Sequence, residues 1–430
     1  MEDICSTHNL ALVTAPLIVA GKSVTQHADN TRFGISAVTQ AWPAGKLTDL
    51  VSAIPMDESH VELVRAGRGH RQGIRTVVLS DKASSNDRLA EGKQFNETWA
   101  AYPDDSPLRS LYPGDSRAAL APFVAHSMLD NTFKWLLYGD DDTIWFLKPL
   151  MAMLEPLDPE MPYVITDHLW WSPANEPHKG LHPATAAPRC LPCNFDDSDQ
   201  DTAAGPFPAP KGCPCTAELL CRQDTRGFFN SQCDMPRAPA RIFSLHGGAG
   251  AVISIGLLKA VGLPFMEKCV KSLYSTGGDA FITICLWQAG YGITDPGTFF
   301  YRHEVQMFDP GPEDRMGVLM KLIRMVERGS SHRCDKQCTR QLDNMVTLHV
   351  RSRVFPSIDD AVIFMKTLTQ LYEVYVELKQ QDEIYGERSQ PVLRLSDAQE
   401  EALRKAHEQG LASSRRTSDP VAKPKAVVPS

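Results

Sequence analysis

The chain has 430 residues, of which 43% are hydrophobic, and its formal net charge is −8 from 44 basic and 52 acidic residues. This length suits one large α/β domain or two ordinary ones, and the apolar content is that of a globular protein. The negative charge excludes a general attraction to nucleic acid or to anionic lipid surfaces, so we expect no nucleic-acid partner.

The N-terminal region predicts a strand and a helix rather than a membrane segment. Glu2 and Asp3 stand where a signal peptide has basic residues, and no run of about 18 apolar residues occurs in the sequence. Pro16–Ala20 is a short apolar run typical of a first parallel strand, and Arg32–Trp42 has the apolar spacing of a helix that buries one face.

Ile74–Ser80 predicts the next strand, and Asp81 follows it directly. Because α/β folds place ligand groups at the carboxyl ends of their strands, Asp81 is a candidate nucleotide contact. Capping of a following helix is the alternative role. Ser116–Asn131 then has the pattern of a helix, in which Pro122 must lie in the first turn or produce a kink.

The most informative stretch is KWLLYGDDDTIWFLKPL, residues Lys134–Leu150. Trp135–Leu137 predicts a short buried strand, and a second apolar run begins at Ile144. Between them stand the adjacent carboxylates Asp140–Asp142, which repel one another unless a cation neutralises them. Hard oxygen ligands suit Mg²⁺ or Mn²⁺, ions that also bind substrate phosphates. A solvated acidic turn is the alternative, and the strand-like aromatic flanks favour the metal site.

Pro162–Thr166 predicts a further strand, which His168–Trp171 follows with two adjacent tryptophans. These two rings suit either burial in the core or a platform on which a sugar stacks.

Residues 172–240 form a predicted insertion rich in proline, glycine and cysteine. The sequence has 11 cysteines, and most of them lie in this segment; Cys334 and Cys338 form a later pair. Paired cysteines in loop-rich sequence indicate disulfides in an oxidising compartment, with the odd cysteine left free. A structural zinc site is the alternative, at Cys190/Cys193 and Cys213/Cys215, although the second pair has CxC where a zinc knuckle has CxxC.

Two glycine-rich segments follow the insertion. Arg241–Val261, RIFSLHGGAGAVISIGLLKAV, predicts a strand, a glycine corner, a strand and a helix. Ile253 occupies the third glycine position of a dinucleotide fingerprint, so the segment does not match that motif. Gly277–Trp287 presents Asp279 at the head of an apolar helix, where an aspartate ordinarily has a capping role.

The C-terminal part contains two strand-like segments and an amphipathic helix. Phe299–Phe308 includes His303, and Met345–Val350 includes His349. A histidine within a strand is more often a hydrogen-bonded core residue than a ligand. Ile358–Leu378 predicts an amphipathic helix.

Several of these segments resemble the fringe-like glycosyltransferases of glycosyltransferase family 31, including the core 1 β1,3-galactosyltransferase-like enzymes and their plant and fungal relatives. The segments are GDDDT at 139–143, GGAG at 247–250, GGD at 277–279 and TLH at 347–349. The resemblance implies a GT-A type α/β fold, with a mostly parallel central sheet flanked by helices and with the Cys/Pro-rich insertion.

The composition and the resemblance together imply a division of the chain. Residues 1–16 form a short N-terminal segment, 17–171 the nucleotide-sugar-binding half, 172–240 the insertion, 241–385 the acceptor and catalytic half, and 386–430 a charged helix with a disordered tail.

The resemblance assigns roles to the candidate site residues. Asp140, Asp142 and His349 are implied metal ligands for Mn²⁺ or Mg²⁺, and His303 is a weaker candidate. Asp279 is the implied catalytic base. Contacts with the nucleotide sugar are implied for the remaining candidates, Asp81, Asp141, Gly248 and Gly250.

The implied activity is inverting transfer of a sugar from a UDP-sugar donor to a glycan or glycoprotein acceptor, through a β-linkage such as β1,3. The implied location is the Golgi lumen, as a type II membrane protein. Relatives carry a signal anchor and stem that this sequence lacks, so we expect a natural chain that is longer at its N-terminus. The Asn96 sequon matters only in a secreted chain.

Two other classes of function remain open. A glycosyltransferase-like domain that binds UDP or sugar without activity fits the missing anchor and Gly278, which replaces an acidic residue found in many relatives. A metal-dependent phosphoesterase fits the DDD cluster alone, but it needs further His and Asp ligands for a second metal, and the sequence shows no such set.

Overall fold

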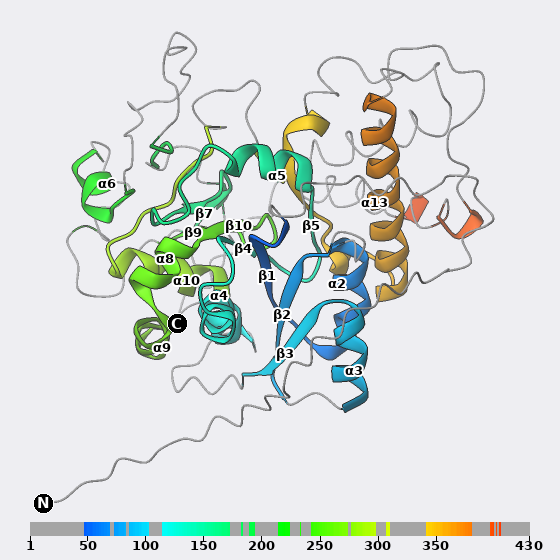
Figure 1. Cartoon of the computed structure of the whole chain (residues 1–430), viewed down its shortest axis with the longest axis horizontal. Helices are drawn as coiled ribbons and strands as arrows, with labels where there is room; N and C mark the ends of the chain where they lie inside the picture. Colours follow the sequence, from blue (N-terminus) through cyan, green and yellow to red (C-terminus); the bar gives the residue numbers. More distant parts are fainter. Residues whose placement is uncertain are drawn as a thin grey trace, which may run out of the picture. The chain divides into compact units, whose positions relative to one another are not determined.

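The computed structural model describes residues 47–68, 73–82, 86–102, 114–172, 182–183, 189–193, 214–223, 233, 242–273, 277–297, 307–309, 341–380, 396–399, 401 and 404–405. All of these residues belong to the compact unit Pro43–Ser430. Figure 1 labels most of the helices and strands described below.

A six-stranded sheet forms the centre of this unit, in the order β3-β2-β1-β4-β10-β6. Strands β3, β2, β1 and β4 run parallel to their neighbours, whereas β10 is antiparallel to β4 and to β6. The bounds are β1 Leu50–Pro55, β2 Arg75–Ser80, β3 Glu97–Ala101, β4 Trp135–Tyr138, β6 Val164–Ile165 and β10 Ala251–Ser254. The predicted α/β class with a mostly parallel central sheet is confirmed.

Both faces of the sheet are buried, which explains why its strands are continuous apolar runs. Val51 and Ala53 belong to one core cluster with Phe123 of α4 (Asp115–Leu129). Leu50, the neighbouring residue of β1, belongs to the cluster on the other side, with residues of α5 (Leu147–Leu154). Helices therefore cover both faces, and the polar groups of the site are left to the ends of the strands.

The remaining helices form two groups beside the sheet. On one side α4 contacts α10 (Gly278–Gln288) and α9 (Leu263–Ser272), next to α8 (Ile255–Val261). On the other side α13 (Ile358–Gln380) lies along α2 (Val61–Arg68), as Figure 1 shows. Helix α3 (Asn86–Gln94) packs on β3. Among the described helices, none has the length and apolar character that crossing a bilayer requires.

Two small sheets each pair segments that are distant in the sequence. In one, β12 (Met345–His349) pairs with β5 (Thr143–Trp145) and with β11 (Met307–Phe308). In the other, β7 (Leu169–Ser172) pairs with β8 (His182–Pro183) and with β9 (Ile242–Leu245). The first sheet joins the segment after the carboxylates to the TLH segment, and the second joins the tryptophan pair to the GGAG segment.

Most predicted elements are confirmed within a few residues: β2, α4, β4, the β9-loop-β10-α8 unit, α10, β12 and α13. The predicted strand Pro16–Ala20 and helix Arg32–Trp42 lie outside the described residues. So does the predicted strand Phe299–Phe308, apart from its last two residues. Strand β1 was not predicted, although it lies at the centre of the sheet between β2 and β4. Pro122 lies in the interior of α4 and not in its first turn, so the carbonyl of Ala118 lacks its helical partner.

Disulfides cross-link the insertion, as the cysteine pattern predicted. Cys190 is bonded to Cys215, and Cys221 is bonded to Cys233. Because Cys190 and Cys215 are joined to each other, the alternative zinc site that needed both thiolates is wrong. A further disulfide, Cys269–Cys285, joins α9 to α10 and was not predicted.

Candidate functional site

Charged residues gather at the carboxyl ends of three neighbouring parallel strands. Asp81 follows β2, His60 lies in the 3₁₀ turn η1 (Glu58–His60) shortly after β1, and Asp140 lies just beyond β4. Because β2, β1 and β4 are parallel, these ends meet at one edge of the sheet. This is the edge where α/β folds commonly bind ligands.

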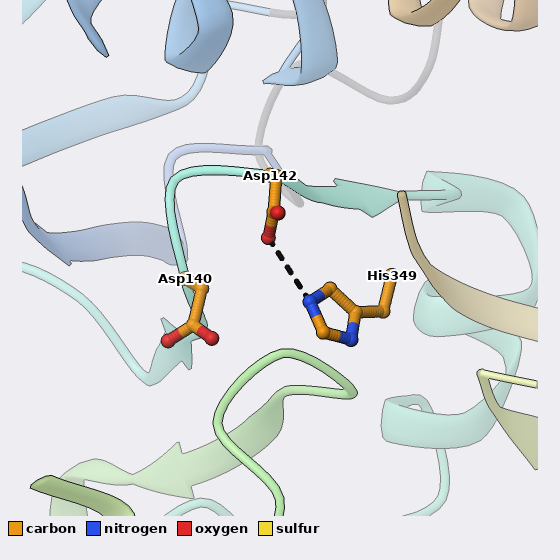
Figure 2. Close-up of side chains that lie close together, drawn as sticks. All are labelled: Asp140, Asp142 and His349. Atoms are coloured by element: carbon orange, nitrogen blue, oxygen red, sulfur yellow. Dashed lines mark ion pairs between the residues drawn. The ribbon is translucent and has the colours of Figure 1, made fainter. Parts of the chain in front are cut away.

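Asp140, Asp142 and His349 form a compact group at this edge. Each residue offers one ligand atom, and these atoms all lie within 4.8 Å of one another. Asp142 Oδ1 and His349 Nε2 are 3.2 Å apart. Figure 2 shows Asp142 pointing at the imidazole of His349, with the Asp140 carboxylate facing the same space. The structure thus brings two acids together with a histidine that lies more than 200 residues after them in the sequence.

Backbone pairing explains how His349 reaches the carboxylates. Strand β12 is antiparallel to β5, with His349 opposite Thr143. Val350 N–H donates to the carbonyl oxygen of Asp142 at 3.0 Å, and Ser352 N–H donates to Asp142 Oδ2 at 2.7 Å. The main chain that carries the histidine therefore also fixes the Asp142 side chain, and it leaves Oδ1 directed at His349.

The GGAG loop closes the group from another side. Thr143 Oγ1 donates to the carbonyl oxygen of Gly248 at 2.9 Å, and it accepts a hydrogen bond from Asp140 N–H at 3.0 Å. A Cβ at Gly248 would overlap the imidazole ring of His349. Position 248 therefore requires glycine, because the His349 ring lies directly against its backbone.

Gly250 is the second glycine of this loop that the geometry requires. Its φ is +82°, a backbone conformation that favours glycine, and a Cβ there would lie 2.9 Å from the Trp145 ring. Gly248 and Gly250 thus shape the loop around His349 and Trp145. Their predicted contacts with a nucleotide sugar stay a prediction.

Asp279 contacts the same loop at Gly247. Gly247 N–H donates to Asp279 Oδ2 at 3.3 Å, and Ala280 N–H donates to Asp279 Oδ1 at 2.9 Å. A Cβ at Gly247 would also lie 3.0 Å from Asp140 Oδ1. One glycine therefore separates the Asp279 carboxylate from the Asp140 carboxylate. The N-cap residue of α10 is Gly277, so Asp279 lies in the first turn and does not have the ordinary capping position.

Electrostatics distinguishes the carboxylates of the site. Desolvation, together with the Asp142 carboxylate, raises the pKa of Asp140 to about 7, although its side chain keeps some contact with solvent. Burial alone would raise the pKa of Asp142, but the adjacent His349 imidazole and Ser352 N–H hold it well below its ordinary value. Burial raises the pKa of Asp279, and the two backbone N–H donors oppose that shift only in part. Asp142 thus provides a permanent negative charge, whereas Asp140 and Asp279 hold protons more readily.

His60 is a contact of the site that the sequence did not predict. Its Nδ1 lies 2.5 Å from Asp141 Oδ2, and this hydrogen bond raises the pKa of His60. Asp141 is therefore directed toward the end of β1 and does not join the group of Asp140, Asp142 and His349. The sequence did not reveal this contact because β1 was not predicted. Strand β1 places the turn η1 at the same edge of the sheet as the carboxylates.

The group fits a hard divalent cation. Two ligand atoms at about 2.1 Å in neighbouring octahedral positions lie about 3 Å apart, which is close to the separation of Asp142 Oδ1 and His349 Nε2. Asp142 Oδ1 is buried and accepts no hydrogen bond from the described residues. A buried carboxylate oxygen without a donor is costly, and a bound cation would remove that cost.

Two candidate residues stand apart from the group. Asp81 is exposed after β2, where its Oδ1 accepts a hydrogen bond from the Ser80 hydroxyl at 3.3 Å. His303 lies outside the described residues. The roles predicted for both stay predictions.

The structure gives a packing reason for Gly278. A Cβ at this position would lie 2.5 Å from Ala118 Cβ and 2.9 Å from the carbonyl oxygen of Asp115, both in α4. The first turn of α10 packs so closely on α4 that no acidic side chain fits there. The departure from the fringe-like pattern at 278 therefore follows from helix packing.

No family model matches the sequence, and no curated protein matches it. Structure neighbours are glycosyltransferases. One is the galactosyltransferase LgtC in complex with donor and acceptor sugar analogs, at 12% identity and a TM-score of 0.35, covering 76% of this chain and 95% of its own. Another is core-mannan synthase A (CmsA/Ktr4) from Aspergillus fumigatus in an Mn/GDP form, at 9% identity and a TM-score of 0.29, covering 56% and 69%. Similarities with TM-scores this low do not support a function for this chain, and any assignment of function must come from the geometry of the site.

Proposed function

We propose that this chain is a metal-dependent inverting glycosyltransferase of the GT-A type. It takes a UDP-sugar and transfers the sugar to a hydroxyl of a glycan or glycoprotein through a β-linkage such as β1,3. The observation that carries the proposal is the group of Asp140, Asp142 and His349 at the ligand-binding edge of the sheet, separated from Asp279 by one glycine loop.

Asp140, Asp142 and His349 would hold Mn²⁺ or Mg²⁺. Bound there, the cation would neutralise charge that develops on the leaving diphosphate. Two carboxylates and one imidazole leave further coordination positions for phosphate oxygens and water, as a cation that binds a nucleotide diphosphate requires. Asp142 contributes a fixed charge because its pKa is low.

Asp279 would accept the proton of the acceptor hydroxyl as that oxygen attacks the anomeric carbon. A general base works best when its pKa is near the working pH, and burial moves the pKa of Asp279 upward. The donors of Gly247 and Ala280 fix the orientation of the carboxylate. With the diphosphate held by the cation and Asp279 as base at the other face of the anomeric carbon, the hydroxyl would displace the diphosphate from behind, which inverts the anomeric configuration.

The resemblance to fringe-like and core 1 galactosyltransferase-like enzymes supports this proposal at the segments that build the site. GDDDT supplies both acids, GGAG forms the loop, GGD begins α10 and TLH ends β12. Four segments that are separate in the sequence thus converge on one edge, which an unrelated acidic turn does not explain.

We propose that the protein works in the Golgi lumen as a type II membrane protein. The disulfides Cys190–Cys215, Cys221–Cys233 and Cys269–Cys285 support an oxidising compartment. Asn96 of the sequon is exposed in the turn before β3. In the secretory pathway, removal of N-glycans should therefore increase the mobility of the wild-type chain and leave Asn96→Gln unchanged. An unmodified chain with reduced cysteines would contradict this location.

Titration of UDP and UDP-sugars into the protein, with Mn²⁺ or with EDTA, tests the enzyme proposal. We expect UDP to bind in the presence of Mn²⁺. The UDP affinity should fall at least about tenfold in EDTA, which removes the ion, and in Asp142→Asn, which loses one metal contact. Asp360→Asn is the matched control, because Asp360 pairs with Lys405 in the first turn of α13.

Turnover separates the alternatives. Transfer or hydrolysis of a UDP-sugar supports the enzyme. Metal-dependent binding of UDP without turnover identifies the inactive binding domain, and hydrolysis of simple phosphate esters identifies the phosphoesterase. A phosphoesterase with two metals would need a second ligand set, and within the described ranges Asp140, Asp142 and His349 form the one such group.

A further inference from the structure

Three aromatic rings that have no part in the proposed mechanism lie next to the candidate metal group. Trp170 stacks on His246 with ring centroids 4.9 Å apart and an angle of 25° between the planes. His168 lies 6.1 Å from Trp170 and 5.4 Å from His246. His246 is in turn 5.2 Å from His349. The rings therefore form a continuous aromatic cluster that begins at His349.

Strand pairing holds these rings in place. Trp170 of β7 is opposite Ser244 of β9, and His246 N–H donates to the carbonyl oxygen of His168 at 3.2 Å. All three rings are half-buried. They are thus ordered by the backbone, yet each retains contact with solvent.

The two central rings offer hydrogen-bond donors. Ala249 N–H donates to His246 Nδ1 at 2.9 Å, so in the neutral imidazole the proton is on Nε2, which is then a donor. Trp170 Nε1 is buried and has no acceptor within the described residues. A buried indole N–H ordinarily has a partner, and the hydroxyl of a ligand bound at the edge of the Trp170 ring would provide one.

We infer that Trp170 and His246 form the binding surface for a pyranose ring, an inference that rests on the proposed glycosyltransferase function. A pyranose has an apolar face of C–H groups, which suits an aromatic ring, and a rim of hydroxyls, one of which could accept from the indole N–H of Trp170. His246 also directly precedes Gly247, whose N–H holds Asp279. A sugar on this surface would therefore lie beside His349 and next to the loop residue that contacts Asp279.

The pyranose could belong to the donor or to the acceptor, and two variants distinguish them. Trp170→Ala removes the larger ring. His246→Asn removes the imidazole and its Nε2 proton, while the amide oxygen can still accept the Ala249 N–H, so the loop is preserved. Trp170→Phe keeps a ring at the same place. Trp99→Phe is the matched control, since Trp99 lies on β3 at the far edge of the sheet and donates to Glu97 at 3.2 Å.

The measurements are titration calorimetry with UDP and with UDP-hexoses in Mn²⁺, and steady-state kinetics with a saccharide acceptor. We expect both Trp170→Ala and His246→Asn to keep the UDP affinity within about twofold of wild type. If the donor sugar binds here, the affinity for the UDP-hexose should fall at least about tenfold. If the acceptor binds here, UDP-hexose affinity stays constant and the acceptor KM rises by at least about tenfold.

The inference is overturned if folded Trp170→Ala and His246→Asn change neither quantity by more than about twofold. Should Trp170→Ala fail to fold, His246→Asn decides alone, with Trp170→Phe expected to retain most binding.

Saturation-transfer NMR with free hexoses separates this test from the proposed function. A wild-type chain that lacks UDP-sugar turnover but binds a hexose, with loss of binding in His246→Asn and not in Trp99→Phe, supports the sugar surface and contradicts the enzyme. Absence of both UDP and hexose binding overturns the two together.

Discussion

The two sides of the loop His246–Gly250 are built differently. On one side, His349 is fixed by pairing with β5 and by contact with Gly248, and Asp142 is fixed by Ser352 N–H. On the other side, Asp279 is held by two backbone donors, those of Gly247 and Ala280. The metal side depends on several chain segments, whereas the Asp279 side depends on two backbone donors, one of which an amide at position 279 still satisfies.

This difference allows effects on the geometry of the metal ligands to be measured separately from effects on proton transfer. A change that moves the backbone or a ring on the metal side should weaken cation binding, because ligand distances tolerate little displacement. A change of Asp279 to asparagine should leave cation binding intact, because Asp279 is not a ligand of the metal group, and should remove the proton acceptor together with one backbone hydrogen bond. The predictions below test that separation.

Asp279→Asn should have the largest effect. The amide has the size of the carboxylate, but it does not accept the proton and its one oxygen accepts only one of the two backbone hydrogen bonds, so we expect the transfer rate to fall about 10²- to 10⁴-fold. Calorimetry should show unchanged binding of Mn²⁺ and UDP. Transfer at the wild-type rate would remove Asp279 from the mechanism, and loss of UDP binding would show that the two sides of the loop are not independent.

Gly248→Ala should act on the metal side. The new Cβ would overlap the His349 ring, so the ring must shift, and we expect Mn²⁺ affinity to fall about 10- to 100-fold, as for other changes that misplace a metal ligand. Metal titration followed by calorimetry measures this effect.

Gly290→Ala provides the control for Gly248→Ala. Gly290 has a φ of +92° and nothing within 4 Å of the new Cβ. Its substitution therefore strains the backbone by about 1 kcal/mol without touching the site. We expect a lower Tm and unchanged Mn²⁺ affinity. Equal metal affinities in the two variants would show that contact between Gly248 and His349 is unimportant.

Asp140→Asn should change how stability depends on pH in the metal-free protein. The pKa of Asp140 is raised to about 7 in the folded state, above the value of about 3.9 in an unfolded chain. The folded state therefore binds a proton that the unfolded chain has released, and the Asp140 contribution to stability falls as pH rises from about 4 through about 7. Asp140→Asn lacks this loss.

Thermal denaturation in EDTA measures the pH effect. The Tm of Asp140→Asn minus that of wild type should grow over this pH range, and other titrating groups largely cancel in the difference. Excess Mn²⁺ should reverse the order at high pH, because the cation stabilises only a chain that binds it. A difference that does not vary with pH would contradict the raised pKa.

Much of the fold could be predicted from sequence because its signals are local. Strand β4 is an apolar run, α13 repeats apolar residues at helical spacing, and the Arg241–Val261 segment alternates strands with a glycine corner. Strand β1 was missed, since LVSAIP contains a serine and ends in proline. Its place between β2 and β4 depends on pairing with strands 20 to 85 residues away, which no local pattern specifies.

The candidate site could be predicted in part. The carboxylates could be recognised in the sequence because they are adjacent, and the glycines because of their spacing. The approach of His349 to Asp142 follows from β12 pairing with β5, and the contact of His60 with Asp141 follows from β1. The role of Gly248 as the surface on which a histidine ring lies is a steric fact of the folded chain, which sequence alone does not reveal.

His60→Gln should have the smallest effect, because its partner Asp141 does not join the metal group. A half-exposed pair of this kind contributes about 0.5 kcal/mol. Its hydrogen bond raises the pKa of His60, so the contribution is present below the ordinary pKa of about 6.5 and is lost as pH rises through the folded value. The Tm difference from wild type should thus be largest near about pH 5 and shrink above neutrality, with Mn²⁺ affinity nearly unchanged. A large loss of Mn²⁺ affinity in His60→Gln, suppressed when Asp141→Asn is combined with it, would instead extend the metal side of the loop to the end of β1.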